Sequence, residues 1–371
     1  MTPPTSSPSS NTTSTHSLPQ SNAAGTASSH GSPSLASIST HQGLELEVKN
    51  LELLHFFTTT TSITLSNLPE QQLVWQQVVP KIAFSHPFLL RGILALSAIH
   101  LGRLHVERRS TLCPVATLHH TAGVILFRST MPNITAENCD ACFAFSTLLV
   151  IYAWSSSCQT GDLFFVDSLK TDGGTVEWVV LLRSCHNLLR LACTWLKDGP
   201  LRCLLLLQTE EPGLPAVPEI ENSSKFRELA ALWDTSRTHL SAEEAEALEE
   251  ALAFLIEVHA FLSPRNRVVD EVGTTLSWPI RVRDSYIAMV SQQKPEALVV
   301  LAHYCLLLNK IDHFWFMAGM SKHLLQTIHQ TVGKEWESWI AWPLQDLVLS
   351  EFKTQTGEKE WQQRTDGAVI Y

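Results

Sequence analysis

The chain changes character near Leu44, where an uncharged stretch gives way to apolar residues spaced three and four positions apart. Val48, Leu51, Leu54 and Phe57 show this spacing, which places them on one face of an α-helix. Similar segments follow almost to the end of the chain, and strand-like alternation is confined to a weak case at 266–276. The pattern predicts an all-α fold, a helical array of about ten or more helices. The expected helices cover residues 70–83, 88–101, 114–131, 136–155, 175–196, 225–238, 241–261, 280–293, 295–312, 315–332 and 336–350.

Two of these segments carry more specific signals. The run 88–101 is apolar almost all round and follows Ser85-His-Pro87, so we expect a helix at the centre of the fold. Ser241 and Glu244 have the spacing of a capping box, in which each side chain pairs with a free N–H at the start of a helix. We therefore expect a helix that begins at Ser241 and exposes an acidic face.

The first 44 residues form a different kind of segment. They contain no acidic or basic residue, and 13 serines, 7 threonines and five prolines make up more than half of them. Such a composition buries too little apolar surface to offset the loss of conformational entropy on ordering. We expect a disordered leader at 1–44 and one helical domain at 45–371. The prolines at 212, 215 and 218 predict a proline-rich loop at 208–222 inside that domain, although a boundary between two domains remains open.

Composition narrows the class of protein. The chain has 26 Lys and Arg against 36 Asp and Glu, a net charge of −10, which argues against wrapping a phosphate backbone. No uninterrupted apolar run reaches the roughly 20 residues of a membrane span, so we expect none. Without a signal peptide, the eight cysteines are expected to be reduced thiols.

The sequence offers few candidate catalytic or metal-binding residues. The 16 histidines are scattered and show no zinc-ligand spacing, and Cys139 and Cys142 are interpreted as buried small hydrophobic residues. We expect no catalytic residue, metal site or cofactor. The 11 tryptophans and 15 phenylalanines can build an apolar ligand pocket between helices as well as a core.

Several phrases together resemble a known family. Residues 53–61 read LLHFFTTTT and residues 79–101 read VPKIAFSHPFLLRGILALSAIHL; PEALVVLAHY at 295–304 and WFMAG at 315–319 follow in the same order. These phrases resemble the regulatory domain of fungal-specific transcription factors, in the branch of the sterol uptake control proteins. The block at 79–101 is the specific part of the resemblance, which extends over about residues 48–345.

The resemblance implies a transcription regulator that acts in the nucleus and controls sterol or secondary-metabolite genes. The protein is also expected to shuttle to the nucleus from the cytoplasm. Its helical domain is expected to sense an apolar small molecule, ergosterol in the sterol branch, and to act with other transcription factors or co-activators. By analogy, the candidate ligand-binding residues are His303, Tyr304, Trp315, Met317 and Gly319. Gly319 would either allow a rigid ring system to approach or serve tight helix packing.

The chain departs from the family at its N-terminus. Family members carry a zinc cluster of six cysteines beside a basic segment, whereas here the first cysteine is Cys113 and the first basic residue is Lys49. No DNA-binding residue is therefore expected, and contact with DNA is indirect unless a zinc cluster lies upstream. A lost exon, a natural short form that acts as co-regulator, and a ligand-binding module without a transcriptional role all remain open. So do an enzyme with histidine-bound metal or haem and a pure interaction scaffold.

Overall fold

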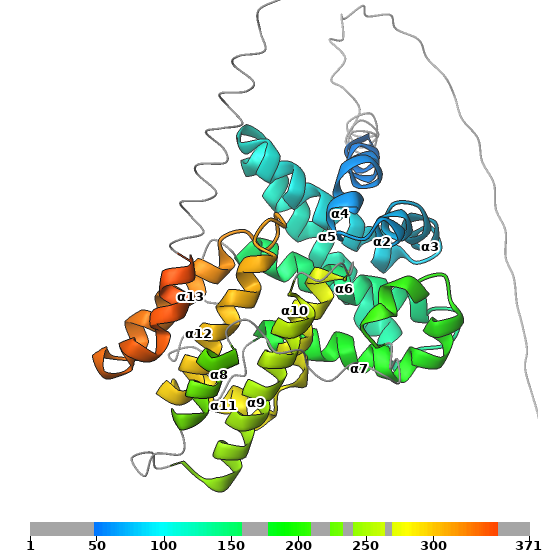
Figure 1. Ribbon diagram of the computed structural model, residues 1–371. Coiled ribbons are helices and arrows are strands. Elements are labelled where there is room, and N and C mark those ends of the chain that lie inside the picture. Colours follow the sequence, from blue (N-terminus) through cyan, green and yellow to red (C-terminus); the bar gives the residue numbers. More distant parts are fainter. Residues whose placement is uncertain (1–47, 158–176, 209–222, 233–239, 264–268, 348–371) are drawn as a thin grey trace, which may run out of the picture. The chain divides into compact units, whose positions relative to one another are not determined.

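A computed structural model describes residues 48–157, 177–208, 223–232, 240–263 and 269–347. The chain divides into two units, Met1–Glu47 and Val48–Tyr371, and all described residues belong to the second. The leader at 1–44 and the proline-rich loop beyond Gln208 lie outside the described residues and stay predictions. Over the described ranges the chain forms helices and turns and no strand (Figure 1), so the predicted all-α fold is confirmed.

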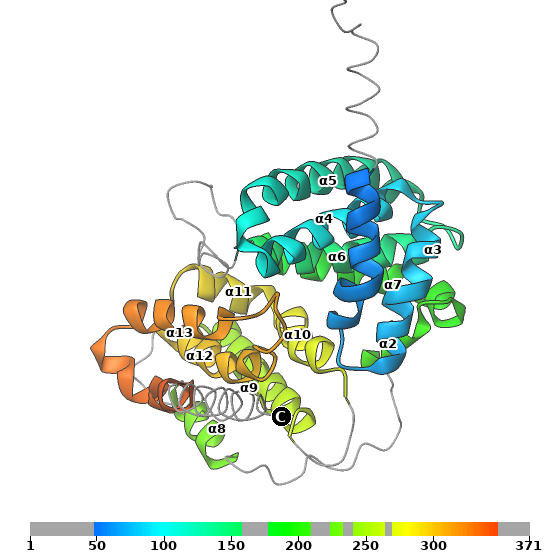
Figure 2. The ribbon, with the colours of Figure 1, turned by 90° about the horizontal axis from the view of Figure 1, so that it is seen from above.

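The N-terminal half is built from short turns followed by three long helices. A helix at 48–56 runs directly into the π-helical turn η1 and the 3₁₀ turn η2, and α2, η3 and α3 follow before the long helices (Figure 2). The bounds are η1 Phe57–Thr61, η2 Ser62–Thr64, α2 Pro69–Leu73, η3 Val74–Val78, α3 Val79–Ala83, α4 Pro87–Leu104, η4 Val106–Arg108, α5 Arg109–Thr130, η5 Met131–Asn133 and α6 Cys139–Ser157.

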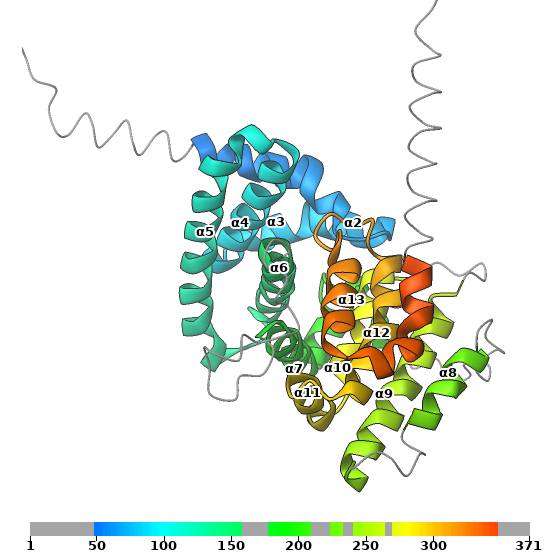
Figure 3. The same ribbon diagram turned by 90° about the vertical axis from the view of Figure 1, so that its left-hand side faces the viewer.

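The C-terminal half adds a second group of helices, with α12 packed against α9, α13 and η8 (Figure 3). Its bounds are α7 Glu177–Asp198, η6 Arg202–Gln208, α8 Ser223–Leu229, η7 Ala230–Leu232, α9 Ala242–Phe261, α10 Glu271–Arg281, α11 Asp284–Ser291, α12 Pro295–Lys310, α13 Met320–Thr331 and η8 Lys334–Ile340.

Several predicted elements need correction. The weak strand expected at 266–276 is wrong where the structure describes it, because α10 begins at Glu271 and the side chain of Asp270 caps it by accepting the N–H of Gly273. The helix expected at 280–293 is two helices, α10 and α11, because Val282 and Arg283 are extended. The helix expected from Trp315 starts only at Met320, because Gly319 adopts φ 81°, which ends any continuous helix there.

The helix α4 is central, as its uniformly apolar sequence predicts. Its residues from Phe88 to Gly102 are mostly buried, and α5 and α6 pack on it. Two glycines permit this close packing around Phe145 of α6. A Cβ at Gly92 would lie 2.8 Å from the Phe145 ring, and one at Gly123 of α5 would lie 3.0 Å from it. The three long helices therefore meet at one aromatic side chain.

Three helices are long and apolar enough to cross a membrane by length and composition alone: Pro87–Leu104, Val106–Asn133 and Cys139–Ser156. The expectation that no segment qualifies is therefore wrong on this criterion, because it counted uninterrupted apolar runs, whereas an average over a helix tolerates an occasional charge. Burial separates the three: 67% of the first and 72% of the last lie inside the protein, against 28% of the most apolar 18-residue stretch of Val106–Asn133. The first and last are core helices of this fold, and the middle one keeps an uncovered face.

Candidate functional site

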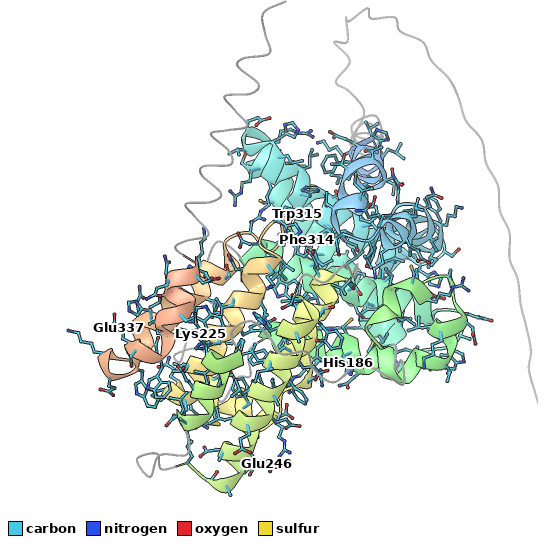
Figure 4. All side chains as sticks on the ribbon, viewed as in Figure 1. His186, Lys225, Glu246, Phe314, Trp315 and Glu337 are labelled. Atoms are coloured by element: carbon cyan, nitrogen blue, oxygen red, sulfur yellow. The ribbon has the colours of Figure 1, made fainter. Side chains whose placement is uncertain are left out.

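The side chain of Trp315 connects the segment between α12 and α13 to the N-terminal half. Its indole ring stacks on the imidazole of His100 in α4, with ring centroids 4.2 Å apart and planes 5° from parallel. The indole N–H donates a hydrogen bond of 2.9 Å to the hydroxyl of Thr64 in η2. Figure 4 labels Trp315 beside Phe314 in this segment. We name the contact between Trp315, His100 and Thr64 the tryptophan junction.

Other side chains of the N-terminal half complete this junction. Nδ1 of His100 lies 3.0 Å from the hydroxyl of Thr61, in the π-helical turn η1. The guanidinium of Arg103, one turn further along α4, donates to the backbone carbonyl of Trp315 and lies over its ring. The indole N–H and the backbone carbonyl of Trp315 thus each have a hydrogen-bond partner, and these bonds fix the position of this tryptophan.

His100 is a neutral member of the junction. Its side chain is only 3% exposed, and burial, assisted by the positive charge of Arg103, lowers the pKa of His100 to about 4. Near pH 7 the imidazole therefore stacks and hydrogen-bonds without a charge. This chemistry suits a structural or ligand-responsive contact better than proton transfer at neutral pH.

A second connection between the halves is polar and buried. Ser66 donates to the side-chain carbonyl of Gln71 at 2.7 Å, and the Gln71 amide donates to the backbone carbonyl of Cys203 at 3.1 Å. Nearby, the amide of Asn67 donates to the carbonyl of Val269, just before α10. Burial raises the pKa of Asp270, the cap of α10, within this group. Residues 66–71 are therefore held to η6 and to the start of α10.

His303 lies in a separate aromatic cluster in the C-terminal half. It is buried in α12, its Nδ1 lies 2.8 Å from the carbonyl of Val299, and burial lowers the pKa of His303 to about 4. Its ring packs edge-on to Trp342 at 5.6 Å and near Phe226 of α8 at 6.2 Å. Lys225 in turn lies 4.6 Å above the Trp342 ring.

Tyr304 points into a third environment. Its ring stacks on Trp278 of α10 at 4.4 Å, and its hydroxyl donates to the carbonyl of Thr275 at 3.2 Å. Because successive residues of a helix project about 100° apart, His303 and Tyr304 are directed toward different neighbours despite their adjacency. The structure therefore does not bring these two candidates to one surface.

Met317 and Gly319 share the segment of Trp315. Met317 is buried, whereas Gly319 is half-buried and its N–H donates to the carboxylate of Asp312 at 2.8 Å. A Cβ built on Gly319 would meet nothing within 4 Å, so tight helix packing does not explain this glycine. Its left-handed backbone conformation does, and the space beside it is open.

Of the five predicted ligand-binding residues, Trp315, Met317 and Gly319 thus lie together, and His303 and Tyr304 lie elsewhere. The residues that hold Trp315 were not predicted as site residues: Thr61, Thr64, His100 and Arg103. A sequence signal did exist, because Thr61 and His100 fall within the two family-like phrases at 53–61 and 79–101. What the sequence does not show is that both phrases meet a tryptophan more than 200 residues away.

Comparison with known families explains why these phrases stand out. Residues 52–193 match the family described as "Fungal specific transcription factor domain". Within these residues the chain is similar to a fungal-specific transcription factor domain. The predicted resemblance is confirmed, and Thr61, Thr64, His100 and Arg103 all lie inside this domain, whereas Trp315 lies outside it.

Relatives extend beyond the fungal-specific transcription factor domain. A Zn(2)-C6 fungal-type transcription factor of Gibberella zeae is 23% identical over 81% of the chain. The sterol uptake control proteins 2 of Candida albicans and Saccharomyces cerevisiae are 34% identical over 29% of the chain and 21% identical over 78% of it. The chain spans 62%, 14% and 31% of the lengths of these three relatives. The first of them is named as a transcription factor and the other two as sterol uptake control proteins.

Proposed function

We propose that this chain is a transcription regulator of the fungal-specific type, acting in the nucleus. The observation that carries the proposal is the fungal-specific transcription factor domain at residues 52–193, together with a transcription factor relative aligned over 81% of the chain. The net charge of −10 supports a regulatory role in which contact with DNA is made by another segment or partner.

A reporter experiment tests this role. The full chain, fused to a heterologous DNA-binding domain, is brought to a promoter in a fungal host, and reporter output is compared with that of the DNA-binding domain alone. We expect a change of several-fold in either direction. Output equal to that of the DNA-binding domain alone, with equal nuclear abundance of both proteins, would remove transcription regulation as the function.

The proposal extends to an apolar ligand of the sterol class. Two relatives are named as sterol uptake control proteins, and the segment of Trp315, Met317 and Gly319 combines aromatic and apolar side chains with open space at Gly319. A ligand can shift the domain only if its affinity differs between two conformations. The tryptophan junction is a suitable element for such a shift, because a change near Gly319 reaches the family domain through Trp315.

The ligand would therefore bind near Gly319 and alter how residues 311–319 contact His100 and Thr64. The target genes would belong to sterol supply or secondary metabolism, and co-activators or other transcription factors would be the protein partners. Saturable binding of tritiated ergosterol to the full chain tests the ligand class. Absence of binding at micromolar ergosterol would remove the sterol while leaving the reporter experiment as a separate test of regulation.

A further inference from the structure

Thr111, in the first turn of α5, follows the only two adjacent arginines in the chain. The segment reads Arg108-Arg109-Ser110-Thr111, so the arginines stand three and two residues before the threonine hydroxyl. Protein kinases select substrates partly by such charge patterns, and arginine-directed kinases bind side chains at these two positions with carboxylates of their substrate groove. The pattern is that of a phosphoryl acceptor for this class of kinase.

The acceptor hydroxyl and its flanking residues are accessible. Thr111 and Ser110 are exposed, Arg108 and Arg109 are half-buried, and within the described ranges no ion pair involves Arg109. No side chain caps the start of η4 or of α5, and uncapped helix ends open most readily. Opening of this turn presents both arginines and the hydroxyl in the extended form that a kinase groove binds. Leu112 stays buried, because the opening ends at Thr111.

Arg108 also holds a carboxylate of another helix. Its Nη1 donates to Oε1 of Glu52 at 2.8 Å and its Nη2 donates to Oε2 at 3.1 Å, which ties η4 to the helix at 48–56. Leu53, the neighbour of Glu52, packs with Leu112 in a small apolar cluster separate from the main core, and Figure 2 shows this first helix in blue beside α5. The ion pair and the small cluster together hold the helix at 48–56 to the start of α5.

A phosphate on Thr111 would lie within reach of the same guanidinium. The Thr111 hydroxyl donates to the backbone carbonyl of Arg108 at 2.7 Å, and residues three apart lie on the same face of a helix. Arginine binds phosphate with the same two-pronged geometry that it uses for a carboxylate, and a phosphothreonine carries a charge of about −1.5 to −2. The phosphate therefore competes with Glu52 for Arg108 and also repels the Glu52 carboxylate.

From this motif, exposure and ion-pair geometry we propose that Thr111 is a phosphorylation site for an arginine-directed protein kinase, and that its phosphate draws Arg108 away from Glu52 and loosens the helix at 48–56. In the transfer, Oγ1 of Thr111 bonds to the γ-phosphorus of ATP, the bond from that phosphorus to the β–γ bridging oxygen breaks, and ADP leaves. The hydroxyl proton passes to the catalytic aspartate of the kinase. This site does not depend on the proposed transcriptional function.

Phosphorylation of the folded full chain tests the acceptor. The chain is incubated with magnesium ATP and the catalytic subunit of cyclic-AMP-dependent protein kinase, and mass spectrometry locates the phosphoryl groups. We expect modification at residue 111 in the wild type and in Ser110→Ala, and none there in Thr111→Val, which keeps the shape of the side chain. Arg109→Gln should lower kcat/KM of the kinase for this site about tenfold or more.

Amide hydrogen exchange tests the structural consequence. After phosphorylation, the backbone amides of residues 48–56 should exchange about threefold faster or more, whereas those of α12 should be unchanged. Glu52→Gln is the matched variant, because it breaks the pair with Arg108 but keeps both arginines of the motif. Its unmodified form should already show the faster exchange, and phosphorylation should add little to it.

Each arm of the test can overturn the proposal. Circular dichroism of each variant confirms that its helices are intact. If a kinase that modifies a short peptide of the same motif leaves Thr111 unmodified, or modifies Arg109→Gln as fast as the wild type, Thr111 is not such a site. If phosphorylated wild type shows no faster exchange at 48–56, or if Glu52→Gln gains as much from phosphorylation as the wild type does, the phosphate does not act by displacing Glu52 from Arg108.

Discussion

The indole of Trp315 and the imidazole of His100 lie parallel and 4.2 Å apart, so a side chain outside the fungal-specific transcription factor domain stacks on one inside it. Thr64 and Arg103 hold the same tryptophan by its N–H and its carbonyl. The junction therefore couples residues 311–319 to the family domain through a few side chains whose removal can be measured.

Truncating the tryptophan should weaken the fold in two separable steps. Trp315→Phe keeps a ring on His100 but loses the hydrogen bond to Thr64, and we expect a loss of about 1 kcal/mol in the free energy of unfolding. Trp315→Ala also loses the stacking and burial, and we expect a loss of about 2–4 kcal/mol. Urea unfolding followed by far-UV circular dichroism measures both. Trp195→Ala, an exposed tryptophan of α7, is the control, and an equal loss in Trp195→Ala and Trp315→Ala would contradict the coupling.

The two glycines of α4 should respond to alanine with opposite signs. A Cβ at Gly92 would lie 2.8 Å from Phe145, so Gly92→Ala forces the α4–α6 packing apart and should cost about 1–3 kcal/mol. A Cβ at Gly102 meets nothing closer than 3.6 Å, so Gly102→Ala should gain up to about 1 kcal/mol from helix propensity. Thermal or urea unfolding of both variants measures the two changes in stability. Equal effects in the same direction would show that contact with Phe145 does not limit the side-chain size at Gly92.

The capping box at Ser241 should account for a measurable part of the stability of α9. The Ser241 hydroxyl accepts the N–H of Glu244 at 3.2 Å, and the Glu244 carboxylate accepts the N–H of Ser241 at 2.9 Å. We expect Ser241→Ala to cost about 1 kcal/mol of unfolding free energy. Ser241→Asn, which can still cap, should retain most of the wild-type value. Similar losses in the two variants would mean that the side-chain cap is not the cause.

Stability should fall as the pH drops below the ordinary histidine range. Burial lowers the pKa of His303 to about 4, whereas in the unfolded chain it is near 6.5. Between these values the unfolded state binds more protons than the folded state, so the stability present above pH 6.5 is lost progressively toward pH 4. Burial raises the pKa of Asp270, and its effect has the opposite sign.

A substitution at His303 separates its contribution to this pH dependence from that of the other titratable groups. The free energy of unfolding is measured by urea titration at pH 7 and pH 5 for the wild type and for His303→Gln. We expect the wild type to lose about 2 kcal/mol more than the variant over this interval, because each unit of pKa shift corresponds to about 1.4 kcal/mol. Parallel pH dependence of the two proteins would show that His303 titrates normally in the folded state.

Local signals predicted local structure well. The apolar run at 88–101 predicts a central helix and becomes α4, and the spacing of Ser241 and Glu244 predicts the start of α9, because both depend on neighbours within a few turns. The weak strand at 266–276 failed because Asp270, read as part of an alternating segment, is the cap of α10. A single residue that accepts one N–H outweighs a faint two-residue alternation.

The candidate site depends on contacts between distant residues that the sequence does not reveal. His303 and Tyr304 looked like neighbours of Trp315 because all three fall in family-like phrases, yet they pack in different aromatic clusters. Helix geometry alone separates His303 from Tyr304, and that separation could have been foreseen. The pairing of Trp315 with His100 and Thr64 could not, because only the folded arrangement brings residues 251 positions apart into hydrogen-bond distance.

Equilibrium binding of tritiated ergosterol to the full chain tests most directly whether the segment around Gly319 receives an apolar ligand. The comparison is between wild type, Gly319→Asn and Gly319→Asp, two variants of nearly equal size that both tolerate a positive φ. The account predicts saturable binding by the wild type, a modest change in Gly319→Asn, and about tenfold or weaker affinity in Gly319→Asp, whose charge must be desolvated beside the ligand. Equal affinities in all three proteins, or no saturable binding by a folded wild type, would contradict it.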